Sequence, residues 1–362
     1  MAPPNIIGKG KNLSQRNFID MTLDVAFAKR LAKSRDRLIE ILDRFSQAKV
    51  LVVGDLTLDE FLTGQVERIS REAPVLIIRH ENTRQVPGGG ANAVYNLATL
   101  GARVKVVGLV GKDDRGVALR NIFDRAGIDT RGMLIDPDRP TVTKTRISGH
   151  ARQSVTQQIV RVDRKSDELP DPGLQQELAD YIREHLSTVD TVVCSDYGDG
   201  VLTPAVISAG LQHSQIIVDT QQDLHRYAGA TIFTPNLPEA ELAVGYKINN
   251  SESLTQAGKD LLALTEAPQM LITRGDEGMS LFDRTAPTEH IPPFNRTDVF
   301  DVTGAGDTVA AALTIALAVG SSSWEAAVLG NLAASIVVRQ FGTATTTIEE
   351  MKLALDKLLE QE

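Results

Sequence analysis

The chain has 362 residues, of which 42% are hydrophobic and 23% are charged, a composition typical of folded globular chains. This composition excludes a disordered tail, a collagen-like fibre and a disulfide-stapled miniprotein. The 38 Lys and Arg residues and the 47 Asp and Glu residues give a net charge of −9, so we expect no nucleic-acid partner, because nucleic-acid binding requires clustered cations.

No membrane-spanning or export segment is expected. The longest apolar stretch, residues 309–319, is about half of the ~20 residues that a spanning helix needs. The N-terminal residues lack the charged-then-apolar layout of a signal peptide. The single cysteine, Cys194, lies in an apolar run and has no disulfide partner, which is typical of a buried thiol in a reducing compartment. These features predict a cytoplasmic protein with no membrane partner.

The first part of the chain differs from the rest. Residues 1–15 contain prolines and glycines without periodicity and predict an arm, and apolar residues at three- and four-residue steps predict a helix within 18–48. The helix is expected to pack either on the main domain or on a partner. An uninterrupted apolar run over 49–53, followed by Gly-Asp, then predicts a strand buried on both faces. We therefore expect an arm and helix over 1–46 and one domain over 47–362.

Predicted helices and strands alternate after this first strand, which indicates βαβ units and an α/β fold with a mostly parallel sheet. Two regions, about 60–80 and 141–163, break the alternation because they are β-rich and are not followed by helices. We expect these two regions to form one small secondary sheet. The alternating elements are expected at 91–100, 104–110, 114–126, 174–186, 191–195, 204–211, 215–219, 254–264 and 270–273.

The most informative motif is the run Gly304-Ala305-Gly306-Asp307 immediately before an Ala-rich apolar helix. The free backbone amides of a helix N-terminus form an anion site, which suits a phosphoryl group in transfer. Asp307 in that turn could accept a proton from an attacking hydroxyl. The alternative is a tight turn with a favourable first-turn residue. Asp301 and Thr303 add oxygen atoms beside the motif and favour the functional interpretation.

Three further groups of polar residues are candidates for binding. Asn236 and Glu239, at a strand-to-helix junction, could hold hydrated Mg²⁺ or could form a helix capping box, and the spacing favours neither. Asn92 follows three glycines that open a helix, and its amide suits sugar hydroxyls. Asp55 and Asp59 follow the first strand, where open α/β sheets bind ligands, although Asp59 could equally be a solvated turn residue. The sequence has no P-loop, dinucleotide-binding or paired-histidine metal motif.

From residue 49 onward the sequence resembles the ribokinase-like (PfkB) family of small-molecule kinases. The motifs that carry this resemblance are Asp301-Val-Thr-Gly-Ala-Gly-Asp307, Gly88-Gly-Gly-Ala-Asn92, Thr234-Pro-Asn-Leu-Pro-Glu239 and Thr273-Arg-Gly275. The resemblance implies a three-layer αβα domain with a mostly parallel central sheet and a small β lid. It also implies an ATP-dependent carbohydrate kinase and, because such dimers are common in the family, a homodimer formed through the lid.

The resemblance assigns roles to single residues. Asp307 would be the catalytic base, and Gly304, Ala305 and Gly306 would form the anion hole. Mg²⁺ would be organised by Asn236 and Glu239, and a K⁺ site would lie near Asp301 and Thr303. The residues implied to bind ATP are Asn236, Arg274, Gly275, Gly306 and Asn331, and those implied to bind the sugar are Asp55, Asp59, Gly88, Gly89, Asn92 and Asp196.

Within the family the sequence is most similar to the kinases of D-glycero-D-manno-heptose 7-phosphate, which phosphorylate O1. Arg68-Ile-Ser-Arg-Glu-Ala-Pro74 and Ser195-Asp-Tyr197 carry this likeness. Three basic residues of that branch are lost, at Glu60, Asp199 and Gln221. The adenylyltransferase half that often follows is not expected in a sequence that ends at Glu362. Replacement cations could come from Lys144, Arg146, Arg152, Arg161 and Arg164, which could equally form a solvated edge.

Other functions remain open at this level. The chain could be a kinase for another sugar or sugar phosphate, such as a ketohexose phosphate. It could be a binding protein that kept the fold without catalysis, although such a protein need not retain Asp307. It could also be a scaffold that acts through the helix expected within 18–48. Sugar-stimulated ADP formation separates the kinases from the other two classes.

Overall fold

The computed structural model describes residues 25–151, 156–221, 223–295, 299–340 and 342–360. The arm expected over 1–15, the first turns of the helix expected from 18, and Arg152 lie outside these residues. The main sheet has the strand order β13-β12-β11-β10-β9-β8-β1-β4-β5, and all its neighbours pair in parallel except β11–β12 and β12–β13. Its strands are β1 (Lys49–Gly54), β4 (Arg103–Gly111), β5 (Asp129–Asp136), β8 (Thr191–Asp196), β9 (Ile216–Thr220), β10 (Ile232–Phe233), β11 (Gln269–Thr273), β12 (Met279–Asp283) and β13 (Glu289–Ile291).

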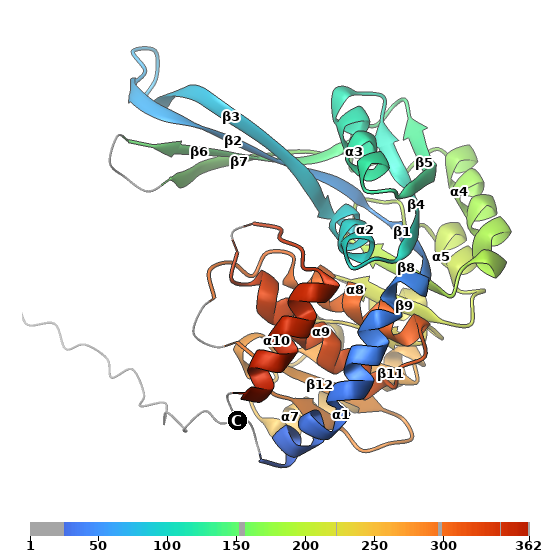
Figure 1. Cartoon of the computed structure of the whole chain (residues 1–362). Coiled ribbons are helices and arrows are strands. Elements are labelled where there is room, and N and C mark those ends of the chain that lie inside the picture. Colours follow the sequence, from blue (N-terminus) through green and yellow to red (C-terminus); the bar gives the residue numbers. More distant parts are fainter. Residues whose placement is uncertain (1–24, 152–155, 222, 296–298, 341, 361–362) are drawn as a thin grey trace, which may run out of the picture.

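Helices cover both faces of this sheet, because alternate residues of its strands point in opposite directions. In β1, Val50 and Val52 join one buried apolar cluster, and Leu51 and Val53 join the other. The three-layer αβα architecture predicted from the sequence is therefore confirmed (Figure 1). The first cluster includes α1 (Val25–Asp43), α2 (Gly90–Thr99), α3 (Asp114–Arg125), α8 (Ala305–Ala318), α9 (Ser323–Val337) and α10 (Ile348–Glu360), and the second includes α4 (Pro172–His185), α5 (Pro204–Gly210), α6 (Leu237–Val244) and α7 (Ser251–Thr265).

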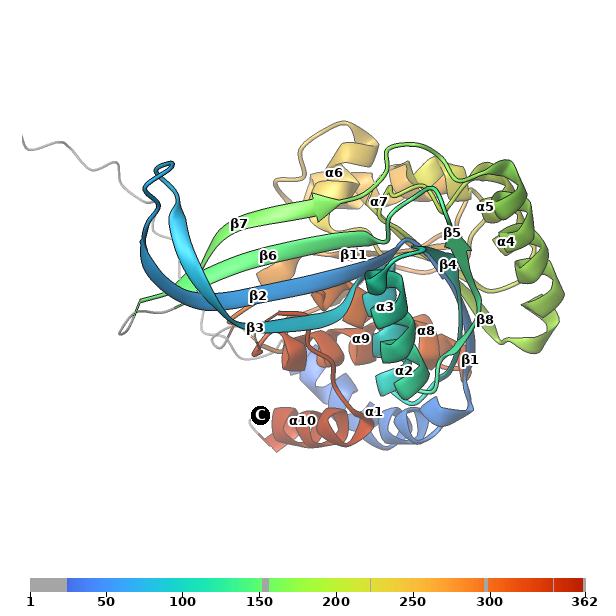
Figure 2. The same ribbon diagram turned by 90° about the horizontal axis from the view of Figure 1, so that it is seen from above.

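The helix α1 packs on the main domain, which decides between the two alternatives left open by the sequence. Its apolar face, with Phe27, Leu31 and Leu38, is buried in the first cluster. It lies beside α10 (Figure 2), where Arg35 pairs with Asp356 at 2.7 Å and Lys352 pairs with Asp43. The described part of the N-terminal segment is thus built into the domain.

Four long strands form a second sheet that projects from the three-layer body (Figures 1 and 2). Its order is β3-β2-β6-β7, with β2 (Leu56–Ile69), β3 (Leu76–Gly89), β6 (Val142–His150) and β7 (Gln157–Arg164). We call this sheet the lid. It joins the two β-rich regions that the sequence singled out. The strands run further than expected, to 56 and 89, because pairing along β2 holds the polar residues of β3 extended.

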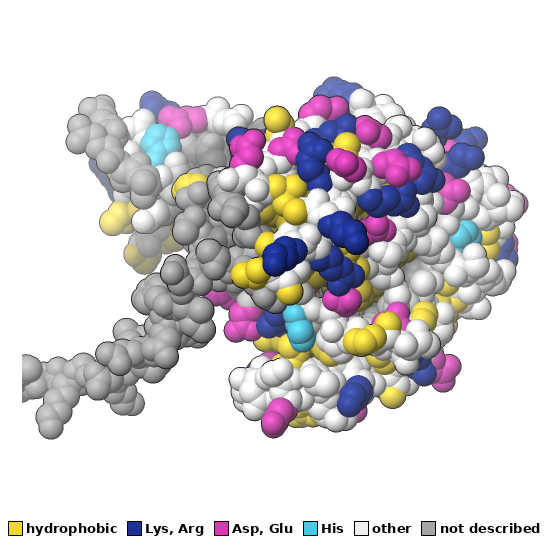
Figure 3. Space-filling model, turned by 60° about the horizontal axis from the view of Figure 1, so that its bottom comes forward, with side chains coloured by type: hydrophobic (Ala, Val, Ile, Leu, Met, Phe, Trp, Pro, Cys, Tyr) yellow, Lys and Arg dark blue, Asp and Glu magenta, His cyan; other side chains and the backbone are white. Residues whose placement is uncertain are grey.

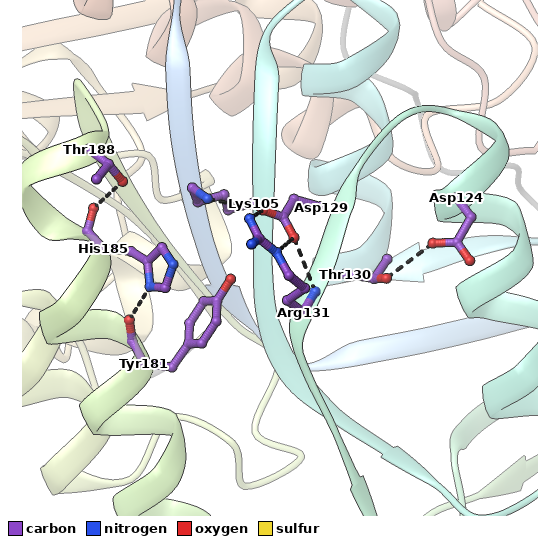
Figure 4. Close-up of polar contacts among 8 residues, drawn as sticks. All are labelled: Lys105, Asp124, Asp129, Thr130, Arg131, Tyr181, His185 and Thr188. Atoms are coloured by element: carbon purple, nitrogen blue, oxygen red, sulfur yellow. Dashed lines mark hydrogen bonds and ion pairs between the residues drawn. The ribbon is translucent and has the colours of Figure 1, made fainter.

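An ionic cluster attaches the edge strand β5 to the sheet (Figure 4). The Asp129 carboxylate accepts a hydrogen bond from Lys105 Nζ at 3.0 Å and two from the Arg131 guanidinium. These contacts, with Arg131 first, hold the pKa of Asp129 well below its usual range despite the opposing effect of burial. The Tyr181 ring of α4 stacks on the His185 ring with centroids 4.0 Å apart.

The surface of the described residues carries both signs of charge. On the face in Figure 3, Lys and Arg side chains are interspersed with Asp and Glu side chains. Among the helices of the described residues, none is both long enough and apolar enough to cross a membrane.

Candidate active site

Asp307 lies in the first turn of α8 and is buried, with 4% of its surface exposed. Its Oδ2 accepts a hydrogen bond from Asn92 Nδ2 at 2.7 Å, and its Oδ1 accepts one from the Tyr197 hydroxyl at 2.8 Å. Gly304 precedes the helix with φ of +78°, and a Cβ there would lie 2.6 Å from Asn92 Nδ2. Glycine is therefore required at 304 by both backbone conformation and close approach.

The charge on Asp307 is destabilised in the folded chain. Burial raises the pKa of Asp307 to about 6, and the hydrogen bonds from Asn92 and Tyr197 act in the opposite direction. Burial raises the pKa of Asp219 to about 8, and the charges of Asp307 and Glu239 add to this effect. Burial also raises the pKa of Glu239. Several carboxylates with raised pKa values at one place are typical of a functional site.

These carboxylates line one cavity of about 180 Å³, which we call the acidic cavity. It lies where β8, β9 and β11 reach their carboxyl ends and where α6 and α8 begin, the usual ligand position in an open α/β sheet. Its lining includes Asp196, Tyr197, Asp219, Asn236, Glu239, Gly304, Gly306 and Asp307.

A second cavity of about 390 Å³ lies next to the acidic cavity and shares Gly306 with it. Its lining is mainly apolar, and its polar members include Asn331 and the turn at Gly275. Val302, Ala305, Val309, Ala334 and Val338 supply part of its apolar lining. The N-terminal turn of α8 therefore separates an acidic cavity from a larger apolar one.

The predicted sugar-binding residues lie on both sides of Asp307. Asn92 contacts it directly, and the charge of Asp59 acts to raise the pKa of Asp307. Asp59 pairs with Arg146 at 2.8 Å and is buried, which is not the position of a solvated turn residue. Gly88 and Gly89 close β3, where Gly88 lies against the Asp59 carboxylate.

The carboxylates of Asp55 and Asp196 are hydrogen-bonded mainly to other groups of the protein. Asp55 is fully buried and accepts backbone hydrogen bonds from Tyr197, Asp199 and Val201, so it holds the loop after β8 and lines neither cavity. Asp196 lines the acidic cavity, but its Oδ2 accepts a hydrogen bond from the Tyr227 hydroxyl at 2.6 Å and pairs with Arg226 at 3.1 Å.

Asn236 and Glu239 form the capping box that the sequence left as one alternative. The Asn236 side chain accepts from the Glu239 backbone N–H at 2.9 Å, and Glu239 Oε2 accepts from the Asn236 backbone N–H at 2.8 Å. Both residues also line the acidic cavity. The cap therefore holds these oxygen-bearing side chains at the cavity wall.

The other predicted residues differ in their access to the larger cavity. Gly275 and Asn331 line it, although Asn331 Nδ2 donates to the Pro292 carbonyl. The Arg274 guanidinium pairs with Glu277 at 2.8 Å and is absent from the lining.

Asp301 fastens the loop before α8, accepting backbone hydrogen bonds from Thr303 and Gly342, each at 2.9 Å. Across the described ranges, no three His, Cys, Asp or Glu side chains converge as a metal-ligand set.

Tyr197 and Asp219 line the site but were not among the predicted site residues, and Lys144, which the sequence offered only as a replacement cation or part of a solvated edge, lies there too. Tyr197 contacts Asp307, Asp219 lines the acidic cavity, and the Lys144 ammonium lies 5.6 Å from the centroid of the Tyr197 ring. Tyr197 and Asp219 follow or end β8 and β9, so the adjacency of these strands would have identified them. Lys144 is placed by the pairing of β6 with β2, which has no local sequence signal.

A buried carboxylate at a helix N-terminus, between an acidic cavity and a larger apolar cavity, is an arrangement suited to an enzyme that transfers phosphoryl groups to small molecules. Residues 47–351 match the model of the pfkB family of carbohydrate kinases, and the chain belongs to that family.

Curated relatives cover most of this chain. The bifunctional protein HldE of Pelobacter propionicus is 42% identical over 323 residues, which are 88% of this chain and 65% of that protein. The bifunctional protein HldE of Geobacter metallireducens is 43% identical over 307 residues, which are 83% of this chain and 61% of that protein. The chain therefore spans less than two thirds of the length of these relatives.

Solved structures share the fold. Arabidopsis thaliana ribokinase, complexed with ribose and ATP, matches with a TM-score of 0.65 and 20% identity, covering 86% of this chain and 99% of that one. Escherichia coli phosphofructokinase-2, in complex with potassium, matches with a TM-score of 0.69 and 17% identity, with the same coverage. At these identities the matches show the ribokinase-like fold that the sequence predicted.

Proposed function

We propose that this carbohydrate kinase transfers the γ-phosphoryl group of ATP to O1 of D-glycero-D-manno-heptose 7-phosphate, giving the 1,7-bisphosphate. The observation that carries the transfer chemistry is Asp307, buried at the start of α8 and hydrogen-bonded to Asn92 and Tyr197. The choice of heptose rests on the heptose-kinase motifs of the sequence and on the similarity to the HldE proteins.

Asp307 removes the proton from the acceptor hydroxyl as that oxygen attacks. A base with a pKa of about 6 is ionised at neutral pH and can still accept a proton in the transition state. Asn92 and Tyr197 fix the orientation of the carboxylate. The backbone amides of Gly304 and Gly306, at the positive end of the helix dipole, stabilise the charge on the transferring group. The Ala305 amide, which the resemblance also assigns to the anion hole, donates instead to the Val302 carbonyl at 3.1 Å.

ATP fits the larger cavity, with Gly275 and Asn331 in its wall and its phosphates toward Gly306. The acceptor sugar then lies across Asp307, between Asn92 and Asp59. The ribokinase structure of the same fold was solved with ribose and ATP, the two classes of ligand that this division requires.

The donor groups of the acidic cavity fit Mg²⁺. Asp219 and Glu239 are half-buried carboxylates that line this cavity with Asp307, and neither forms an ion pair with a cation of the described residues. Asn236 adds an amide oxygen. Mg²⁺ bound there would neutralise charge on the ATP phosphates, with few protein ligands and several waters. Asp301 and Thr303 are the corresponding proposal for K⁺, supported by the phosphofructokinase-2 structure with potassium.

A homodimer formed through the lid is also part of this proposal. All residues of β7 are exposed, including Ile159, Val160 and Val162. An exposed strand with apolar side chains is suited to pairing with a second copy.

The test is ADP release with ATP·Mg²⁺ and D-glycero-D-manno-heptose 7-phosphate, compared with the unphosphorylated heptose and a ketohexose phosphate. We expect turnover to be fastest with the heptose phosphate and to disappear in Asp307→Asn. Faster turnover with another acceptor would refute the heptose assignment. If no sugar stimulates ADP release, the result would instead support a binding protein without catalytic activity.

A further inference from the structure

A row of three side chains crosses the lid and has no role so far. Phe61 of β2 stands opposite Arg84 of β3 and opposite Arg146 of β6. The guanidinium carbon of Arg84 lies 5.0 Å from the centroid of the Phe61 ring, and that of Arg146 lies 5.2 Å from it. One aromatic ring therefore holds two guanidinium groups in place by cation–π contact.

This row continues into the active site. Asp59 and Lys144 stand opposite each other two residues closer to the body, and side chains two residues apart on a strand share a face. The Lys144 ammonium lies over the Tyr197 ring, and the charges of Lys144 and Asp59 both act on Asp307. The face of the lid that carries Phe61 is thus the face directed at the catalytic carboxylate.

The cations on this face outnumber the acids that pair with them. Arg146 pairs with Asp59 at 2.8 Å, but Arg146 Nη1 is buried and makes no well-aligned hydrogen bond. Within the described part of the chain, Arg84 has no carboxylate oxygen within 4.0 Å of its side-chain nitrogens, whereas the charge of Lys144 acts on the carboxylates of Asp199 and Asp307. Gathering like charges is unfavourable, so this face suits a ligand that brings negative charge.

The residues that replace the lost basic residues of the heptose-kinase branch supply no cation to this face. Glu60 points to the opposite face of β2, where it accepts from Gln85 and Thr145 and lies 3.7 Å from Arg115. Arg161 pairs with Asp163, and Arg164 donates to Thr145. Of the lid cations that the sequence offered as replacements, Lys144 and Arg146 face the site, and Arg84 joins them.

We propose that Arg84 and Arg146 bind the phosphate that the acceptor already carries, at the end remote from the hydroxyl attacked beside Asp307. This inference rests on the proposed function. Guanidinium groups suit phosphate because they donate paired hydrogen bonds, and such charge-assisted bonds are strong. The row of Phe61 lies about 7 Å beyond the row of Asp59, two residues along the strand, which leaves room for the sugar between phosphate and base.

The variant Arg84→Gln removes the cation that contacts the Phe61 ring and has no carboxylate partner among the described residues. Arg79→Gln on the same strand is the matched control, because Arg79 bonds to Gln65 farther along the lid. Losing charge-assisted phosphate contacts should raise the KM for heptose 7-phosphate about 10- to 100-fold in R84Q, with the KM for ATP unaltered. The preference for phosphorylated over unphosphorylated heptose should fall by the same factor. Arg84→Lys should recover part of it. If R84Q and R79Q give equal KM values, the subsite is refuted and the heptose assignment stands.

Inorganic phosphate provides a readout independent of turnover. Phosphate should raise the thermal unfolding temperature of the wild type and of R79Q, and much less that of R84Q. If the wild type fails on heptose 7-phosphate but shows this difference, the heptose assignment falls and the phosphate subsite stands. Equal protection of all three proteins by phosphate would overturn the subsite.

Discussion

Two carboxylates, one in an edge strand of the main sheet and one in a helix at its carboxyl end, have pKa values shifted in opposite directions. Asp129, on the edge strand, contacts Lys105 and Arg131, and its pKa lies well below the usual range (Figure 4). Asp307, at the carboxyl end of the sheet, is buried, forms no ion pair with a cation of the described residues, and has a pKa of about 6. The fold therefore stabilises the charged form of Asp129 and destabilises the charged form of Asp307. The Asp307 carboxylate, whose charge lowers folding stability, is the one suited to take part in a reaction.

The largest expected effect is that of Asp307→Asn. Removal of a general base lowers the rate about 10²- to 10⁴-fold. Burial moves the pKa of Asp307 from 3.8 to about 6, so the cost of its charge develops as the pH rises through this interval and is complete above it. The neutral variant should therefore have a higher melting temperature than the wild type at pH 8.

The control for this prediction is the same pair of proteins at pH 4, where the difference in melting temperature should shrink. Loss of activity with a lower melting temperature at pH 8 would show that the Asp307 charge stabilises the fold, which would remove the contrast with Asp129.

The next effect concerns Glu239. Glutamine serves at this position of a capping box as well as glutamate does, so Glu239→Gln keeps the helix cap but removes the charge at the acidic cavity. We expect the Mg²⁺ concentration for half-maximal rate to rise about tenfold, which corresponds to about 1.4 kcal/mol. The midpoint of urea unfolding should change little. An unaltered Mg²⁺ requirement would reduce Glu239 to a capping residue.

A smaller change is expected from Tyr197→Phe. The lost hydroxyl donates to Asp307 and acts to lower the pKa of that carboxyl. A hydrogen bond to a charged group contributes about 1.5 kcal/mol or more, so the acid limb of the pH–rate profile should move upward by about one pH unit. Rates at pH 8 should fall only severalfold. A profile that keeps its wild-type limb would show that this limb does not report Asp307.

The smallest effect is that of Asp129→Asn, at the edge. We expect a loss of about 1 kcal/mol of folding stability with no change in kcat, because the ion pairs are partly exposed. Since the folded pKa of Asp129 is depressed, its contribution is present above the unfolded value and is lost as the pH falls through the acid range. Urea unfolding at pH 7 and pH 3 should show the difference between the proteins at pH 7 and less of it at pH 3.

The sequence predicts the fold well where local pattern decides it. The apolar run of β1 and the glycines before α8 place the sheet and Asp307 correctly, because burial on two faces and a helix start both have short-range signals. The two β-rich regions were correctly joined, but the length of β3 was not predicted, because its polar residues are extended only by pairing with β2.

The site was less predictable than the fold. The sequence identifies Asn92 and Glu239 by motif, yet it cannot show that Arg274 turns to Glu277 or that Asp55 is occupied by three backbone amides. Tyr197 and Lys144 enter the site through contacts between distant segments. The roles of such residues follow from tertiary packing, which no local spacing encodes.

One junction connects the lid with the residue that contacts Asp307. β3 ends at Gly89 and α2 begins at Gly90, and Asn92, which bonds to Asp307, lies two residues farther on. Gly89 has a φ of +52° and lies close to Thr57 of β2. The lid strand is thus joined through a single glycine to the first turn of α2. Because no loop separates the lid strand from the residue that orients the Asp307 carboxylate, a change in the position of β3 is expected to change the orientation of Asn92 as well.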